Sequence, residues 1–306
     1  MHVRGNGRHG RRQGRGGHQH RFWKTPQTIV LFANITSLSS KAIADLKQDP
    51  AQVVMLAEHH VVQSKAKWLG NTIRSMDRRP FAAFAQGTIE HGSQGGILIA
   101  PRKHISVSKS LGWTQDRYGV FSNPSSCRFS ASMQLNGKVP IILCAGYHRN
   151  GMDDDIWRQW SRDTNGGRLL FIGAADFNIS REQVRESPWL GLLDAALVDF
   201  DGITCSSGDG RAIDFVVVSK SLLPQVKVSV EWGHPWSPHA ALRITLRWDL
   251  EAMHKWVPKR PSQWSLGGLH QLPTADFDDI LLQTKEKLAR DPQFSAASIH
   301  SQQYWS

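Results

Sequence analysis

The 306-residue sequence predicts an α+β fold in which two β-sheets pack against each other and helices lie outside them. Short apolar runs of strand length outnumber the segments with helical spacing, which favours sheets as the main structure. The two kinds of segment do not alternate strictly along the chain, so a parallel sheet of βαβ units is not expected. A hydrophobic fraction of 40% is ordinary for a protein with a sizeable core.

The predicted strands are buried apolar runs or segments in which apolar and polar residues alternate. The alternation before Asn136-Gly137 and the apolar run after it form the clearest hairpin, because this dipeptide is typical of two-residue hairpin turns. We expect strands at 28–33, 53–57, 95–100, 127–135, 139–147, 168–174, 212–219 and 242–248.

Three helices are predicted between these strands. One contains Leu38, Ala42 and Leu46 at helical spacing and ends before Pro50. A second contains Ala66, Leu69, Ile73 and Met76, and a short acidic helix covers 153–160.

The chain divides into three predicted parts. The globular domain covers 26–250, and an arm rich in Gly, Arg and His precedes it at 1–25. A linker rich in Pro, Gly and Trp follows within 251–306, together with an amphipathic helix and a tail. That helix has two interpretations, a partner-binding helix or a cap on the domain. The chain is expected to be either a fragment of a retrotransposon polyprotein or a stand-alone relic of one.

The net charge of +11 is concentrated near the N-terminus. Seven Arg and Lys residues lie in the first 24 positions, whereas the first acidic residue is Asp45. Such an arm buries no apolar area and is predicted to be disordered. Its charge favours polyanion partners such as nucleic acid, with a solvated tail or spurious upstream translation as the alternatives.

The cysteines and the apolar runs indicate the cellular compartment in which the protein is expected. Cys127, Cys144 and Cys205 are too widely spaced for a disulfide framework or a zinc site. No apolar run approaches the length of a membrane span, and none resembles a signal peptide. We expect an intracellular protein, and the Arg-rich arm makes the nucleus a candidate location.

Several predicted strands end in polar residues, and strand ends at one rim of a sandwich converge. Carboxylate and amide oxygens suit a hard cation such as Mg²⁺ or Mn²⁺, an aspartate can deprotonate water, and a protonated histidine can bind phosphate. A further aspartate can hold that histidine's ring. The candidates are Asn34, Glu58, Tyr147, Asp176, Asn178, Asp214 and His239.

The order of these motifs resembles the endonuclease/exonuclease/phosphatase superfamily, and the similarity covers about 26–250. The segments are "AEHH", "GGILIA", "ADFN", "RAID" and "SPH". The sequence is most similar in character to abasic-endonuclease-like proteins and to the endonuclease modules of non-LTR retrotransposons. The resemblance implies a four-layered α/β/β/α sandwich of two mainly antiparallel sheets. It also implies a Mg²⁺- or Mn²⁺-dependent hydrolase of phosphoric esters.

The same resemblance implies a role for each residue. Glu58 is the main metal ligand, with Asn34 beside it, and Tyr147 contacts the phosphate. Asp176 activates the attacking water and Asn178 helps to position it. His239 binds the scissile phosphate and is steadied by Asp214.

Two positions depart from the family pattern. Ala175 replaces a glycine, with little harm expected unless the backbone there needs a positive φ. Pro238 replaces an aspartate on the metal side of the site, while Asp214, the partner of His239, is present. We therefore expect weaker metal affinity and reduced turnover. Proline also fixes φ and lacks a backbone donor, so a shifted loop and an inactive copy stay open as alternatives.

The substrate follows less directly than the reaction. The basic arm and the positive charge of the remaining chain favour nucleic acid, with DNA preferred, because phosphate contacts dominate such binding. The alternatives are a phosphatase of a small or lipid phosphoester and a catalytically weakened nucleic-acid-binding relic. Trp113, Trp232 and Trp236 either stack on bases or pack within the domain.

Overall fold

The computed structural model describes residues 27–88, 92–108, 114–123, 125–135, 139–149 and 151–247. The arm at 1–25, the turn at 136–137, Trp113 and the segment at 251–306 with its predicted helix lie outside these residues. Within the described part, no helix is long and apolar enough to cross a membrane.

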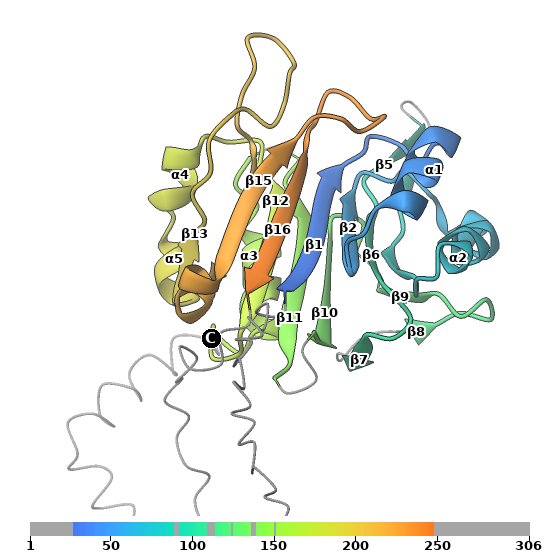
Figure 1. Ribbon diagram of the computed structural model, residues 1–306, viewed down its shortest axis with the longest axis horizontal. Coiled ribbons are helices and arrows are strands. Elements are labelled where there is room, and N and C mark those ends of the chain that lie inside the picture. The colour runs from blue at the N-terminus through green and yellow to red at the C-terminus, as the bar shows by residue number, and fades with distance from the viewer. Residues whose placement is uncertain are drawn as a thin grey trace, which may run out of the picture. The chain divides into compact units, whose positions relative to one another are not determined.

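Two large sheets form the centre of the domain (Figure 1). Most neighbouring strands are antiparallel, and β1–β2, β3–β9 and β11–β12 are the parallel pairs. The eight-stranded sheet has the order β15 (Val226–Glu231), β16 (Ala241–Arg247), β1 (Gln27–Asn34), β2 (Val53–Ala57), β6 (Ile97–Pro101), β3 (Phe81–Ala83), β9 (Phe121–Asn123), β8 (Thr114–Gln115). The six-stranded sheet has the order β13 (Ala195–Leu197), β14 (Asp214–Ser219), β12 (Phe171–Asp176), β11 (Ile141–Tyr147), β10 (Arg128–Gln134), β7 (Ser106–Ser108); β4 (Gln86–Thr88) and β5 (Gly92–Gln94) pair separately.

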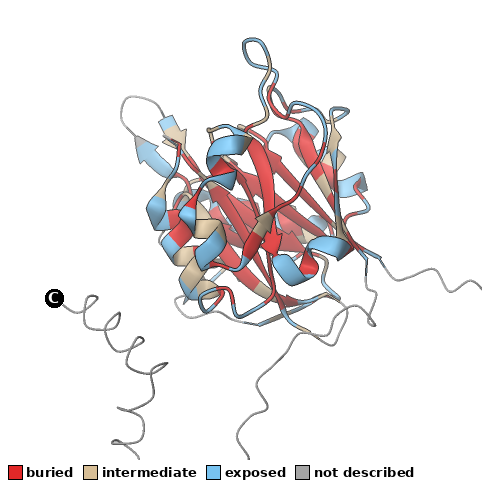
Figure 2. Ribbon diagram, turned by 90° about the vertical axis from the view of Figure 1, so that its left-hand side faces the viewer, coloured by how far each residue is buried: buried red, intermediate tan, exposed pale blue. Residues whose placement is uncertain are grey.

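Helices cover the outer faces of both sheets, which confirms the four-layered sandwich. On β1, Val30 and Phe32 belong to the core shared by the two sheets, whereas Leu31 and Ala33 pack in a second core. This second core includes Leu46 of α1 (Ser40–Gln48) and residues of α2 (Ala66–Ser75). On the other side lie α3 (Asp154–Asp163), α4 (Arg181–Arg185) and α5 (Pro188–Leu192). The buried residues run through both sheets, and the exposed ones lie on the helices and loops (Figure 2).

The predicted helices and main strands are present with small differences at their ends. The strand expected at 168–174 begins only at Phe171, because the chain turns through Gly166 and Gly167 at positive φ. The acidic helix continues to Asp163, and Asp153 is its N-cap. The structure adds β15, the short strands, the 3₁₀ turns η1 (Gln63–Lys65) and η2 (Lys220–Gln225), and the helices α4 and α5.

Trp160 of α3 packs directly onto the six-stranded sheet at two glycines, Gly146 and Gly173. A Cβ at Gly173 would lie 2.8 Å from Cζ3 of this indole, and the ring is fully buried. We expect Gly173→Ala to lower the free energy of unfolding by about 2 kcal/mol, because a packed core accommodates added volume poorly. Urea denaturation measures this, with Gly191→Ala as control, since a Cβ there meets no atom within 4 Å. Equal stability of the two variants would contradict the tight packing of Trp160.

Candidate active site

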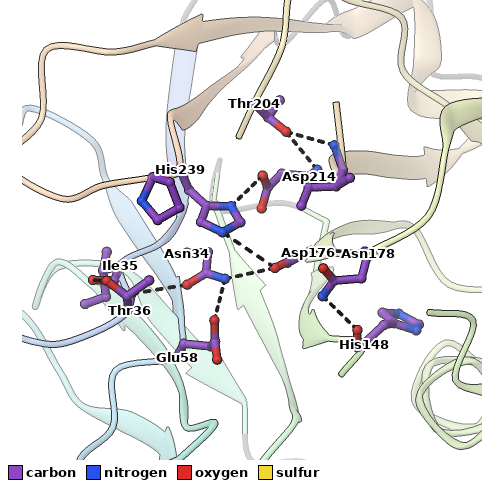
Figure 3. Close-up of polar contacts among 12 residues, drawn as sticks. Asn34, Ile35, Thr36, Glu58, His148, Asp176, Asn178, Thr204, Asp214 and His239 are labelled. Carbon is purple, nitrogen blue, oxygen red and sulfur yellow. Dashed lines mark hydrogen bonds and ion pairs between the residues drawn. The ribbon is translucent and has the colours of Figure 1, made fainter. Parts of the chain in front are cut away.

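Strand ends from both sheets bring the polar residues to one rim. In the six-stranded sheet, Tyr147, Asp176 and Asp214 are register partners on three neighbouring strands. In the eight-stranded sheet, Asn34 ends β1 and Glu58 directly follows β2. Figure 3 shows Asn34, Glu58, Asp176, Asp214 and His239 converging on one another. The sequence-predicted residues are thus neighbours, although they come from distant parts of the chain.

Asn34 connects the two sheets through its side-chain amide. Its Nδ2 donates to Glu58 Oε2 at 2.7 Å and to Asp176 Oδ2 at 2.9 Å, and its Oδ1 accepts from the Thr36 backbone N at 3.2 Å. Asn34 is 1% exposed. A buried amide with both ends satisfied has one orientation, so it fixes the two carboxylates relative to each other.

Glu58 is held in its ionised form. Burial is the largest single influence and opposes ionisation, but the nearby His60 ring and the hydrogen bonds of Asn34 and Tyr147 together outweigh it and hold the pKa of Glu58 below its usual value. The backbone of Glu58 has a φ of 55°, a left-handed conformation uncommon outside glycine. Such backbone geometry is found at functional sites, where the surrounding structure maintains it.

Tyr147 contributes a neutral phenol beside this carboxylate. Burial, followed by the charge of Glu58, raises the pKa of the Tyr147 hydroxyl above its ordinary value. The hydroxyl therefore keeps its proton and donates a hydrogen bond at any pH near neutral.

Asp176 is almost fully buried, at 2% exposure. Burial and repulsion from Asp214 raise its pKa to about 7, against the opposing effects of His239 and Asn34. The backbone N of Asn178 donates to Asp176 Oδ1 at 3.1 Å, while the Asn178 Nδ2 donates to the His148 carbonyl at 2.9 Å. An aspartate with a pKa near neutral can accept a proton from a bound molecule and release it again.

His239 and Asp214 form a buried pair. The Nδ1 of His239 lies 2.9 Å from Asp214 Oδ2, and its Nε2 lies 4.0 Å from Asp176 Oδ2. Burial disfavours the charged ring, but the hydrogen bond and charge of Asp214, helped by Asp176, raise the pKa of His239 to about 9. The imidazole is therefore protonated at neutral pH, with its Nε2–H directed to the Asp176 side.

The loop that contains Pro238 still positions His239. The Ser237–Pro238 peptide bond is cis. The Pro238 carbonyl accepts hydrogen bonds from Ser206 N at 2.9 Å and Ser206 Oγ at 3.1 Å, and the Ala240 N donates to the Thr204 carbonyl at 2.7 Å. Both sides of His239 are thus anchored to the segment at 204–206.

Thr204 is a positioning residue that the sequence did not indicate. Its hydroxyl accepts hydrogen bonds from the backbone N of Ile213 at 3.0 Å and of Asp214 at 2.9 Å, and its carbonyl binds the residue after His239. It lies in an irregular segment with neither period nor motif, so the sequence offered no signal for it.

Two sets of residues at this rim have ligands suited to a metal. The ligating atoms of Asp176, Asp214 and His239 lie within 4.8 Å of one another and could hold an ion. However, a protonated imidazole cannot ligate a metal. The ionised Glu58 is the other candidate, because its carboxylate oxygens are ligands that hard divalent cations prefer. Asn34 turns its Nδ2 to Glu58 and its Oδ1 to the Thr36 backbone N, so in this arrangement it positions the carboxylate and does not present its oxygen beside it. The donor chemistry therefore fits a divalent ion at Glu58 better than one at His239.

Comparison with known proteins identifies the fold. No family model matches the sequence, and no curated protein matches it. The endonuclease domain of TRAS1, a telomere-specific non-LTR retrotransposon, is similar in structure at 16% identity, with a TM-score of 0.52, 72% of this chain and 99% of that chain covered. An AP endonuclease from Leishmania major has a TM-score of 0.56 at 12% identity over 72% and 88% of the two chains. The human Nocturnin catalytic domain, solved with bound sulfate, has a TM-score of 0.52 at 12% identity over 72% and 94%. The chain shares its fold with these three proteins, in agreement with the fold that the motif resemblance implied.

Proposed function

We propose that the protein is a metal-dependent phosphodiesterase that acts as an endonuclease on nucleic acid. One observation carries the proposal: one rim of the sandwich holds an ionised Glu58, a proton-accepting Asp176 and a protonated His239. These are the three kinds of group that hydrolysis of a phosphodiester uses. Two of the structurally similar proteins are endonucleases by name, which supports nucleic acid as the substrate. The net charge of +11 agrees with a polyanionic substrate, and DNA is favoured.

The proposed mechanism assigns each residue one task. Asp176 accepts a proton from the attacking water, and Asn178, fixed to the His148 carbonyl, orients that water. His239 donates a hydrogen bond to a phosphate oxygen, and Asp214 keeps its ring protonated and oriented. Tyr147 donates to the phosphate from the Glu58 side. A divalent ion held by Glu58, Mg²⁺ or Mn²⁺, would supply charge stabilisation in the transition state, and Asn34 would hold the Glu58 carboxylate in place.

Nicking of supercoiled plasmid under a Mg²⁺ or Mn²⁺ titration tests the proposal. Wild-type protein is compared with Glu58→Ala and Asp176→Ala. Nicking that needs metal and disappears in both variants supports a metal-dependent endonuclease. If the folded wild-type protein shifts DNA in gels but nicks none at any metal concentration, the surviving function is nucleic-acid binding. Hydrolysis of small phosphoesters without plasmid nicking would favour a phosphatase.

The metal requirement is a separate prediction. Pro238 supplies no carboxylate near Glu58, so we expect nicking to need a high Mg²⁺ concentration, because affinity for divalent ions falls with the number of charged ligands. Glu58→Gln removes the ionised ligand and should raise the metal concentration for half-maximal nicking at least about tenfold. Glu182→Gln is the matched control, because Glu182 is exposed on α4. Identical metal curves for wild type and Glu58→Gln would remove Glu58 from the metal site.

A further inference from the structure

A groove opens beside the candidate active site, on the side of Glu58. It has a volume of about 600 Å³, and its walls come from the loop before α1, the segment after β2 and the start of α2. His60 lines the groove, and its Nε2 lies 3.7 Å from Glu58 Oε1. A ligand in this groove would therefore reach His60, whose ring lies beside Glu58, the proposed metal ligand.

Trp68 is the most unusual residue of the groove. It lies in the first turn of α2, whose buried side consists of Ala66, Leu69, Gly70 and Ile73. Trp68 is off this side and is 44% exposed. Covering a large, solvent-exposed indole with a flat partner lowers the free energy, because apolar surface is removed from water.

The other groove residues favour an anionic partner. Lys65 contributes a positive charge, Ser37 and Ser93 contribute hydroxyl groups, and none of the lining residues is acidic. His59 has a structural role at the base of the groove. Burial lowers its pKa to about 4, and its ring nitrogens contact the Ala83 carbonyl and the Val61 backbone N. An aromatic surface beside a cation matches a nucleotide, which has a base to stack and a phosphate to neutralise.

We propose that this groove binds an unpaired nucleotide of the nucleic-acid substrate, with its base stacked on Trp68 and its backbone phosphate near Lys65. The inference rests on the proposed function for the identity of the polymer. It goes further because a base inside a duplex is already stacked on both faces and cannot cover the indole. The substrate is therefore single-stranded, or is unpaired next to the bond that is cleaved.

Binding without cleavage tests the groove independently of the reaction. The full chain, in EDTA at about 150 mM salt to limit contacts by charge alone, is titrated with a fluorescent single-stranded dT oligonucleotide, and anisotropy is measured. An oligonucleotide of equal length made of abasic units, and a duplex, are the comparison ligands. Variants are Trp68→Ala, Trp68→Phe, Lys65→Ala and Leu192→Ala. Leu192 is a large hydrophobic residue on α5 that is 63% exposed and does not line the groove, which makes it the control.

We expect wild-type protein to prefer dT over the abasic chain by about tenfold, the usual contribution of one stacked base. Trp68→Ala should lose this preference, Trp68→Phe should keep part of it, and Leu192→Ala should keep it all. Lys65→Ala should weaken the binding of both oligonucleotides and reduce the dependence of their affinity on salt concentration. Duplex binding should change less than twofold in Trp68→Ala.

Two results would overturn the proposal. One is a full preference for dT in Trp68→Ala, and the other is an equal loss of single-stranded and duplex binding. The outcome is distinguishable from that of the proposed function, because plasmid nicking that persists alongside either result leaves the endonuclease intact. Conversely, if the preference for dT depends on Trp68 but the protein never cleaves DNA, the nucleotide-binding groove is supported and the proposed endonuclease activity is not.

Discussion

Asp176→Asn should slow metal-dependent nicking by about 10³-fold or more, the effect expected when a general base is removed. The variant keeps the shape of the side chain, but its single oxygen can accept a hydrogen bond from the Asn34 amide or from the Asn178 backbone N, not from both. Beyond that hydrogen bond, it loses the capacity to accept a proton, which Asp176 has because burial and Asp214 raise its pKa to about 7. Single-turnover nicking of supercoiled plasmid at saturating Mg²⁺ measures the chemical step.

The control for this variant is Asp155→Asn, which makes the same chemical change at an exposed carboxylate on α3. Its rate should match that of wild type. Circular dichroism and gel shifts should show that Asp176→Asn is folded and binds DNA. A rate within tenfold of wild type in Asp176→Asn would mean that another group takes the proton, and the mechanism would need a different base.

The long elements of the fold were predictable because each one carries its own pattern. The buried run of β2 and the helical spacing of Leu38, Ala42 and Leu46 depend on local sequence alone. Strands such as β3, β8 and β9 have two or three residues, too few to show a period, and exist through their sheet partners. The edge strand β15 was not predicted, although its sequence does carry a pattern. Val226, Val228 and Val230 alternate with polar residues, which is typical of a strand.

The site residues were predictable where they follow a strand or match a family motif. The sequence placed Asn34 and Glu58 at neighbouring strand ends, and the structure joins them through a hydrogen bond of 2.7 Å. Thr204 and His60 act through the three-dimensional arrangement, by contacts to Asp214 and Glu58 that no spacing encodes. The pKa values of these groups depend on burial, which exists only once the two sheets have packed.

The aromatic residues show the same limit. Trp232 and Trp236 were candidates for stacking on bases, but Trp236 is 7% exposed and stacks on His234 with ring centroids 4.4 Å apart. The sequence did not indicate a role for Trp68, because it is a single position outside the apolar face of an amphipathic helix. Its place in the same groove as His60 follows only from how α2 lies beside the segment after β2.

Asp214→Asn should lower nicking at neutral pH by about a hundredfold or more and move the alkaline limit of the pH–rate profile to lower pH. His239 acts in its protonated form, which predominates below its pKa of about 9. Wild-type activity should therefore persist to about pH 9 and decline above it as the ring loses its proton. Without the Asp214 charge, burial is opposed only by the weaker effects of Asp176 and Cys205, so the pKa of His239 falls and the decline begins at lower pH.

The pH–rate profile and an NMR titration of the His239 ring measure the same shift by independent routes. Asp45→Asn is the matched control, since Asp45 Oδ2 pairs with His234 Nδ1 at 2.8 Å in a second histidine–aspartate pair built on α1. That variant should leave the His239 titration and the alkaline limit unchanged. If Asp214→Asn also left both unchanged, Asp214 would not be the group that keeps His239 charged. The anchoring of the Pro238 loop by 204–206 would then explain the position of His239 but not its protonation.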